Sequence, residues 1–371
     1  MKSIKQCKEL KGKTVFVRVD YNVPLKDGKV LDGFRIDASL ATIDFLVKKK
    51  AKVVLLAHIG EDGSETLLPV AKYLKRKIAV TFCPAKELHD IEQAVTKLVS
   101  GEVLLLENIR QFDGEKTNDK TLAKAVASMG DIFVNDAFSV SHRKHMSVVG
   151  LAMKLPAYAG VALEQEVKTL SQALKPKHPF VFILGGAKFD TKLPLLKKYS
   201  TSSDVLFVGG ALANNVLKEK GYEVGKSVVD DTSVKTKSLW SKKNFLTPID
   251  VVVLRGNQAI NIDVSEVLEG DTIVDIGKET IKLLTPVFAK AKLVVWNGPL
   301  GWYEKGFVKS TKDLLGVINK SKAQVIIGGG DTAFLAHKMK LGNKVFISTG
   351  GGATLDFLAN GTLAGISVLS K

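Results

Sequence analysis

Short apolar segments alternate with amphipathic ones along nearly the whole chain. In the first half, residues 14–20 and 52–58 read as buried strands, and residues 35–48 carry apolar side chains at helical spacing. Strands that are apolar on both faces and separated by helices are typical of a parallel sheet covered on both sides. Ligands of such sheets bind beyond the carboxyl ends of the strands. The alternation therefore predicts an α/β fold.

The alternation restarts after a proline-bounded break near residue 179. A length of 371 residues also exceeds the usual size of a single hydrophobic core, so two domains are expected. In the second half we expect strands at residues 180–184, 205–208, 251–254, 292–296, 324–327 and 344–348. A helix is expected over residues 231–242, and residues 256–272 show neither period. Residues 158–174 show a helix but no strand. The predicted fold is two doubly wound, Rossmann-like parallel-sheet domains joined by a hinge helix, with boundaries at 1–157, 158–178, 179–358 and 359–371.

Two glycine triplets follow predicted strands and open predicted helices. They lie in AQVIIGGGDTAFLA (residues 323–336) and KVFISTGGGATLDFL (residues 344–358). Glycines in this position let main-chain N–H groups approach a ligand, and the helix N-terminus adds partial positive charge. Tight turns that need glycine only for packing are the alternative. Two successive triplets favour an anion site, and Asp331 beside the first is a hard oxygen ligand suited to Mg²⁺.

The formal net charge of +16 raises the question of partners, since nucleic acid and small polyanions both attract a basic chain. The lysines are scattered, and aromatic residues that would stack bases are not interleaved with them. We therefore expect no nucleic acid partner. Arginine is sparse, which suggests that it is kept where a planar bidentate fork is needed. The six arginines are Arg18, Arg35, Arg76, Arg110, Arg143 and Arg255.

Cysteine use and hydropathy bear on location. Cys7 and Cys83 are the two cysteines, so a disulfide framework is not expected and a reducing compartment fits. The chain holds no run of 18 apolar residues, and its first residues lack the apolar segment of a signal peptide. We expect a cytoplasmic protein without a membrane partner.

Polar side chains follow several of the predicted strands. Lys188 and Lys192 come after a glycine turn and would share one face of a helix, where they suit phosphate oxygens, although a solvated surface pair is the alternative. Asn297 and Glu304 flank a turn with aromatic residues and could hold a base and its ribose, or only a plain turn. Arg143 lies between two histidines on a loop, which suggests anion recognition.

Eight segments, in order along the chain, resemble the phosphoglycerate kinase family. They are FVRVDYNVPL (16–25), DGFRI (32–36), LLENIR (105–110), VNDAFSVSHRKH (134–145), LGGAKFDTK (184–192), VWNGPLG (295–301), GGGDT (328–332) and STGGGATLDFL (348–358). The resemblance implies a glycolytic enzyme of two domains with a cleft between them. It would transfer the acyl phosphate of 1,3-bisphosphoglycerate reversibly to MgADP, giving 3-phosphoglycerate and MgATP. A monomer is expected, with the last residues returning to the N-terminal domain.

The resemblance also implies a role for individual residues. The glycerate would be bound by Asp20, Asn22, Arg35, His58, Arg110 and Arg143. The nucleotide would be bound by Lys188, Lys192, Gly209, Asn297, Glu304, Gly329, Gly330, Asp331 and Thr332, with Asp331 toward Mg²⁺. The transferring group would be stabilised by Arg35, Lys188, Gly350, Gly351 and Gly352. Arg18 lies within a matching segment but on a strand, so a structural role is expected for it.

One departure from the family pattern falls in the expected glycerate site. Glu61 stands where the family has an arginine that helps hold substrate. An acid there would repel a phosphate, so weaker glycerate binding is expected. Two alternatives to the kinase follow from these features: an impaired relative that binds nucleotide but has an altered glycerate site, and a nucleic-acid-binding protein, which explains only the charge.

Overall fold

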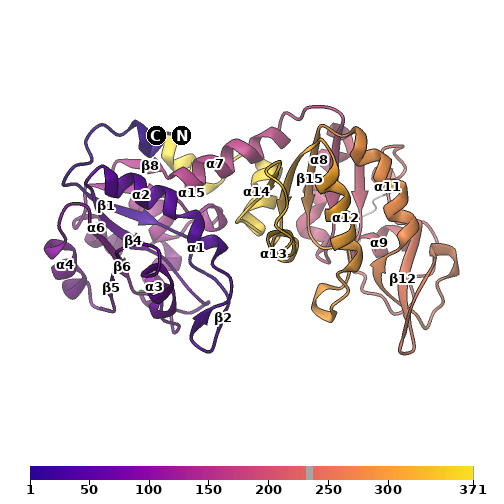
Figure 1. Cartoon of the computed structure of the whole chain (residues 1–371), viewed down its shortest axis with the longest axis horizontal. Helices are drawn as coiled ribbons and strands as arrows, with labels where there is room; N and C mark the ends of the chain where they lie inside the picture. Colours follow the sequence, from indigo (N-terminus) through magenta and orange to yellow (C-terminus); the bar gives the residue numbers. More distant parts are fainter. Residues whose placement is uncertain (231–236, 371) are drawn as a thin grey trace. The chain divides into compact units, whose positions relative to one another are not determined.

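The computed structural model describes residues 1–230 and 237–370 of the chain. Two compact units are present (Figure 1). The first consists of Met1–Lys168 together with Thr362–Lys371, and the second is Thr169–Gly361. Each contains a parallel sheet with helices on both faces, which confirms the predicted α/β class.

Unit 1 is built on a six-stranded sheet in which every neighbouring pair is parallel. Its order is β5 (Thr81–Cys83), β6 (Val103–Leu106), β4 (Lys52–Leu56), β1 (Thr14–Arg18), β7 (Ile132–Asn135) and β8 (Ala157–Ala159). The expectation that residues 158–174 lack a strand is wrong, because β8 pairs with β7 there. β8 has only three residues, which is too short to show a sequence period.

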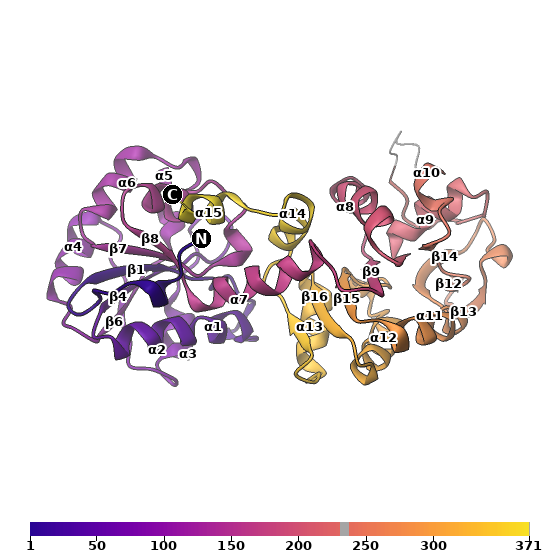
Figure 2. The same cartoon turned by 90° about the horizontal axis from the view of Figure 1, so that it is seen from above.

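Helices cover both faces of this sheet (Figure 2). On one face lie α1 (Phe34–Ala38), α2 (Leu40–Lys48) and α3 (Leu68–Leu74), and on the other α5 (Gly114–Thr117) and α6 (Lys120–Ala127). α4 (Leu88–Lys97) precedes β6. The predicted helix over residues 35–48 is interrupted at Ser39, whose hydroxyl donates to the Ile36 carbonyl (2.7 Å) and so competes with the helix backbone.

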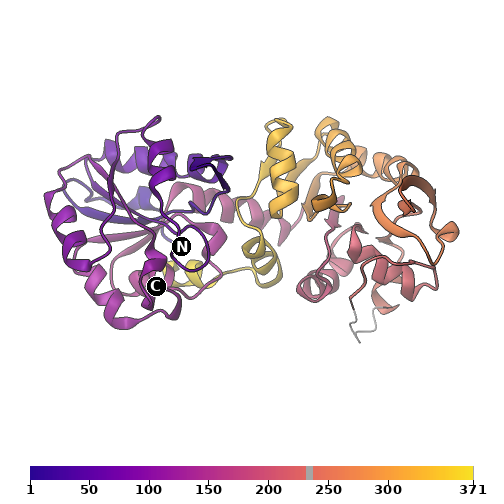
Figure 3. The same cartoon turned by 90° about the horizontal axis from the view of Figure 1, so that it is seen from below.

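The C-terminal residues pack within unit 1. α15 (Ala364–Ser367) is held by the Gly365 N–H, which donates to Ser141 O (2.7 Å), and by Asn135 Nδ2, which donates to Gly365 O (3.1 Å). A Cβ at position 365 would stand 2.6 Å from Val148 Cγ1, so only glycine fits this contact. The two termini lie close together (Figure 3), with the Lys2 N–H 3.4 Å from Leu369 O.

α7 (Val161–Leu170) begins against a buried carboxylate. Asp136 Oδ1 accepts from the N–H groups of Ala162 (2.9 Å) and Leu163 (3.1 Å), while Oδ2 has no partner among the described residues. Burial raises the pKa of Asp136 to about 7, although hydrogen bonds from Thr42 and the two amides act in the opposite direction. Because the native state binds this proton more tightly than the unfolded chain, the stability of unit 1 should fall as pH rises from about 4 to about 7.

Asp136→Asn is expected to remove that pH dependence. An asparagine keeps an acceptor for the two amides and carries no charge. As pH rises from 5 to 8, the stability of the variant relative to wild type should therefore increase by about 1 to 3 kcal/mol. All three tryptophans lie in unit 2, so native-state hydrogen exchange of the β7 amides, corrected for intrinsic rates, is the suitable probe. Asp44→Asn, at an exposed carboxylate, is the matched control. If the stability difference between Asp136→Asn and wild type were the same at pH 5 and pH 8, the raised pKa of Asp136 would be contradicted.

Unit 2 contains a second six-stranded parallel sheet. Its order is β11 (Phe245–Leu246), β10 (Val205–Val208), β9 (Phe180–Leu184), β15 (Leu293–Asn297), β16 (Gln324–Gly328) and β17 (Val345–Ile347). One face is covered by α8 (Phe189–Ser202) and α9 (Ala211–Glu219), and the other by α11 (Lys278–Lys290), α12 (Lys309–Lys320) and α13 (Gly330–Lys338) (Figure 2). α14 (Gly352–Asn360) follows β17 and packs on α8.

Two expectations for unit 2 are wrong. The strand expected at residues 251–254 is β12 (Asp250–Arg255), which lies in a separate antiparallel sheet with β13 (Gln258–Asp263) and β14 (Thr272–Ile276) instead of the parallel one. Residues 256–272 therefore do contain strands. β13 has no buried residue, so its apolar pattern is weak, but the two-residue Gly-Asn turn before it is a hairpin signal. Of the helix expected at 231–242, residues 231–236 lie outside the described residues, and α10 covers Lys237–Trp240.

Candidate active site

Polar side chains gather at the carboxyl ends of the strands in unit 1. Asp20 and Asn22 follow β1, His58 follows β4, and Arg110 lies in a short helix after β6. Because these strands are neighbours in the parallel sheet, their carboxyl ends meet at one edge. Arg143 follows β7, which is the other neighbour of β1.

Arg35 is held by the segment that follows β1. Its Nη1 lies 3.3 Å from Asp20 Oδ2 and donates to Asn22 O (3.1 Å). Asp20 also accepts from Ser139 Oγ (2.5 Å) and is almost fully buried. The Arg35 side chain remains 30% exposed, so it keeps donors available for a ligand.

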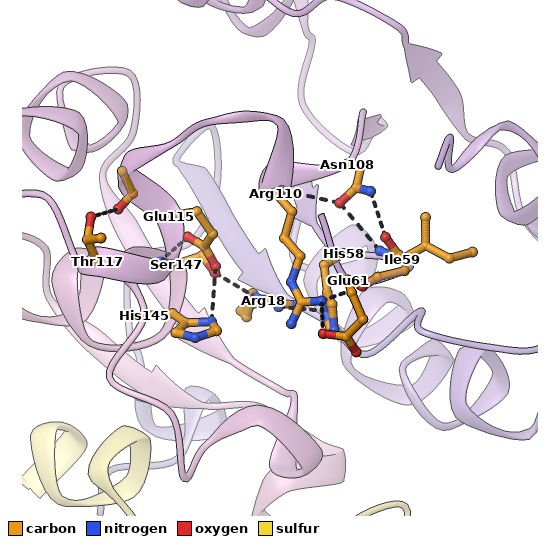
Figure 4. A network of polar contacts seen from close by, with 12 residues as sticks. Arg18, His58, Ile59, Glu61, Asn108, Arg110, Glu115, Thr117, His145 and Ser147 are labelled. Atoms are coloured by element: carbon orange, nitrogen blue, oxygen red, sulfur yellow. Dashed lines mark hydrogen bonds and ion pairs between the residues drawn. The ribbon is translucent and has the colours of Figure 1, made fainter. Parts of the chain in front are cut away.

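A buried polar chain extends behind the edge of the sheet (Figure 4). Glu115 accepts from the amide (2.9 Å) and the hydroxyl (2.6 Å) of Ser147, and Ser147 Oγ accepts from Arg18 Nε (2.8 Å). Arg18 Nη2 lies 3.0 Å from His58 Nδ1. Since a guanidinium can only donate, Nδ1 of His58 is the acceptor. Burial, followed by the charge of Arg18, lowers the pKa of His58 far below its usual range, so the ring is neutral with its proton on Nε2.

His145 is neutral for the same reasons. Its Nδ1 lies 3.7 Å from Glu115 Oε1, but burial and the charge of Arg143 lower its pKa to about 4. The two histidines therefore add hydrogen-bonding groups to the edge and no positive charge near pH 7. The charge comes from the arginines.

Arg110 and Glu61 form an ion pair that crosses the boundary between interior and solvent. Arg110 Nη1 lies 3.3 Å from Glu61 Oε2 and also donates to Gly60 O. The Arg110 side chain is 2% exposed, whereas that of Glu61 is 83% exposed. Glu61 thus lies on the solvent side of a buried cation. Arg143 makes no side-chain hydrogen bond or ion pair with any residue in the described ranges.

Unit 2 contains a pocket of about 470 Å³ at the carboxyl ends of its strands. The residues that line it include most of those assigned to the nucleotide by resemblance. These are Lys188, Lys192, Asn297, Glu304, Gly329, Gly330 and Asp331. Gly351, which the resemblance assigns to the transferring group, lines it as well. Gly209 and Thr332 of the nucleotide set do not line it, nor do Gly350 and Gly352 of the set for the transferring group, although each directly adjoins a residue that does.

Two pairs of glycines around this pocket differ in what surrounds them. A Cβ at Gly185 would stand 2.2 Å from Pro299 O, and one at Gly298 would stand 2.4 Å from Gly185 O, so these two are required by backbone packing. Gly330 and Gly352, at the first positions of α13 and α14, have no atom within 4 Å of the corresponding point. Packing alone does not explain glycine at those two positions. Open space before two helix N-termini is suited to an anion.

Several buried polar groups at this pocket lack partners within the described part of the chain. Lys192 is 7% exposed and makes no ion pair, and burial, followed by the nearby charge of Lys188, lowers its pKa. Asn297 Nδ2 and Thr332 Oγ1 are buried without a hydrogen bond. Unpaired buried polar groups are costly, so these groups are suited to a polar, anionic ligand.

Asp331 stands at the mouth of the first open glycine turn. Burial raises its pKa, and the carboxylate of Glu304 raises it further. Two neighbouring carboxylates whose negative charges repel each other are suited to binding a cation. Among residues 1–230 and 237–370, no cluster of three or more His, Cys, Asp or Glu residues could hold a metal by itself. A metal here would need ligands from a bound molecule.

Sequence patterns did not indicate two residues of these regions. Glu115 reads in the sequence as one of many surface acids, yet it lies in α5 and is fully buried, in contact with Ser147 and His145. Asn214 lies in the pocket of unit 2 and belongs to none of the recognised segments. Within the described residues no single helix is long and apolar enough to cross a membrane, and the bent pair Gly352–Asn360 and Ala364–Ser370 meets that test only when taken together.

The phosphoglycerate kinase family model matches residues 4–361. Phosphoglycerate kinase of Coprothermobacter proteolyticus is 40% identical over 97% of both chains, and that of Dictyoglomus turgidum is 38% identical over 97% of this chain and 96% of its own. Among solved structures, phosphoglycerate kinase from Coxiella burnetii has a TM-score of 0.85 at 36% identity, covering 99% of this chain and 98% of its own. That from Pyrococcus horikoshii has a TM-score of 0.87 at 29% identity, covering 100% and 98%. The chain belongs to the phosphoglycerate kinase family.

Proposed function

We propose that the chain catalyses reversible transfer of the acyl phosphate of 1,3-bisphosphoglycerate to MgADP, giving 3-phosphoglycerate and MgATP. The observation that carries the proposal is the pocket in unit 2, where Lys192 is buried with no ion-pair partner among the described residues and two glycine turns leave open space before helices. A polyphosphate would satisfy both features. Family membership supports the same reaction.

The edge of the sheet in unit 1 is the proposed glycerate site. Arg35, Arg110 and Arg143 would bind the phosphate and carboxylate of the substrate, since a guanidinium fork matches both groups. Neutral His58 would donate through Nε2, because Arg18 fixes its tautomer. Asp20 and Asn22 would orient Arg35, which both contact.

The nucleotide would be bound in unit 2. Lys192 and the amides of Gly329 and Gly330 would hold phosphate oxygens, with Asn297 and Thr332 as further hydrogen-bonding groups. Glu304 would bind the ribose, and the Gly209–Gly210 turn would pass beside the nucleoside.

Asp331 would hold the Mg²⁺ of the nucleotide. The residues fit such an ion, because Mg²⁺ is commonly bound by one or two carboxylates together with phosphate oxygens and water. When bound, the ion would neutralise charge on the phosphates.

The proposed reaction needs positioning and charge neutralisation more than acid–base chemistry. The attacking carboxylate or diphosphate oxygen is already ionised near neutral pH, so no general base is required. Arg35, Lys188 and the amides of residues 350–352 would stabilise the transferring phosphoryl group. Because the two sets of residues belong to different units, the proposal includes a hinge within residues 158–178.

Location and assembly complete the proposal. Both cysteines are free thiols, which supports a reducing, cytoplasmic compartment. Each proposed set of site residues lies within a single copy of the chain, which is compatible with a monomer.

Turnover tests the proposal. Purified protein, Mg-ATP and 3-phosphoglycerate would be combined with a coupled dehydrogenase that consumes the acyl phosphate, and loss of NADH would be followed. Turnover that Arg35→Ala reduces by at least about 100-fold is expected, because this substitution removes a cation from the reacting group. Arg76→Ala, at an exposed arginine of the same unit, should leave the rate unchanged. Absence of turnover by a folded, ADP-binding wild-type protein would overturn the proposal.

A further inference from the structure

Asn214 carries an unpaired hydrogen-bond acceptor in the wall of the nucleotide pocket. It lies on α9, is 2% exposed and lines the pocket. Its Nδ2 donates to Val228 O (3.0 Å), whereas its Oδ1 is buried and has no partner among the residues that the structure describes. A carbonyl can only accept, so the amide orientation is fixed by this contact. The free group is therefore an acceptor.

Apolar side chains line the pocket together with Asn214. They include Leu217, about one turn further along α9, and Val228, whose carbonyl accepts from Asn214, as well as Val251 and Ile273, which pack with Leu217. A buried acceptor among apolar groups loses its hydration without compensation. Such a position is expected to be satisfied by an N–H group of a bound molecule.

We propose that Asn214 Oδ1 accepts a hydrogen bond from the 6-amino group of bound adenine and so makes the pocket selective for adenine nucleotides. The inference rests on the proposed function, which places a nucleotide in this pocket. A nucleotide has charged phosphates for Lys192 and a flat base with a polar edge for the apolar side chains and Asn214. A purine with a 6-oxo group would present an acceptor to Asn214, leaving both oxygens unpaired.

Equilibrium binding of three diphosphates tests this inference independently of turnover. They are ADP, purine riboside 5′-diphosphate, which lacks the amino group, and IDP, which carries a 6-oxo group. Wild type should bind ADP about fivefold to tenfold more tightly than purine riboside diphosphate, and IDP should bind more weakly still. In Asn214→Leu, which keeps a similar volume without an acceptor, the ratio of ADP to purine riboside diphosphate affinity should fall to about one.

Asn215→Leu is the matched control, because Asn215 is adjacent on the same helix but does not line the pocket. Asn215 contacts the Asp230 N–H and the Ala211 carbonyl, which are structural contacts. The Asn215→Leu variant should therefore change the affinities for all three diphosphates by the same factor and leave their ratios unchanged. Equal binding of ADP and purine riboside diphosphate by wild type would overturn the inference, and so would an unchanged ratio in Asn214→Leu. Selective binding without turnover would remove the proposed reaction but retain the adenine contact. If wild type binds none of the three, both proposals fail.

Discussion

Replacing Lys192 with methionine is expected to lower kcat by about 100-fold to 1,000-fold, with a smaller change in the affinity for ADP. Removing one preorganised electrostatic donor from a transition state has an effect of this size. The Lys192 side chain is almost fully buried and has no ion-pair partner in the described residues, so its charge is available to a phosphate. Charge increases on the phosphoryl oxygens during transfer, which is why kcat should respond more than binding.

The position of Lys192 supports a fixed geometry. Its Nζ lies 3.0 Å from the point where a Cβ of Gly186 would stand, so the chain keeps glycine where the ammonium approaches the turn. Lys188, one helical turn earlier, is exposed and is the cause second to burial of the lowered Lys192 pKa. Two cations that disfavour each other without a ligand would both be stabilised by a polyphosphate.

Controls for Lys192 lie on the same helix. Lys197→Met, at an exposed lysine of α8 whose side chain makes no hydrogen bond or ion pair with any described residue, should leave kcat unchanged. Lys192→Arg keeps the charge but has a larger head group, and it should recover only part of the rate. A Lys192→Met enzyme with wild-type kcat and weaker ADP binding would show that this lysine binds the ground state and the transition state equally.

The sequence predicted the parallel sheets well because their strands are apolar on both faces and bounded by helices. β9 and β15, for example, are buried at every position. The antiparallel hairpin of β12 and β13 was not predicted, since β13 lies at the edge of its sheet with no buried residue and gives no strong period. β8 escaped notice because of its length. Short and edge strands depend on pairing with distant residues, which a local pattern does not contain.

The candidate site was predictable from the sequence where a residue type occurs for few structural reasons. Glycine triplets after strands and scarce arginines indicated the two regions that are proposed to bind anions. The buried chain from Glu115 to His58 was not predictable, because it joins four segments far apart in sequence. The same holds for Asn214, whose importance appears only when its second amide atom is found unpaired.

Replacing Glu61 with arginine is expected to tighten binding of 3-phosphoglycerate by about tenfold to a hundredfold, with Glu61→Gln giving about fivefold. In the native protein the Glu61 carboxylate pairs with Arg110, the most deeply buried arginine of the proposed glycerate site. A substrate anion must compete with that carboxylate for the same guanidinium. Glutamine removes the competing charge, while arginine adds a charge-assisted donor, which contributes more.

Because Glu61 is exposed, its substitution should have little effect on the stability of the fold. Glu61 is 83% exposed, so solvent screens it and the native ion pair contributes little to stability. Both variants should therefore fold as wild type does, and the change should appear in substrate affinity. Since only glycerate binding is altered, the affinity for ADP should stay constant, which separates this effect from general damage.

Glu65→Gln provides the control, because Glu65 lies in the same loop and does not pair with Arg110. Equilibrium binding of 3-phosphoglycerate at fixed ionic strength is the measurement, since salt would weaken the competition between the two anions. Tighter binding by wild type than by Glu61→Arg would show that the carboxylate assists the substrate instead of competing with it. In that case Glu61 would act by holding Arg110 in place, and Glu61→Gln, which can still accept a hydrogen bond from Arg110, should bind more tightly than Glu61→Arg.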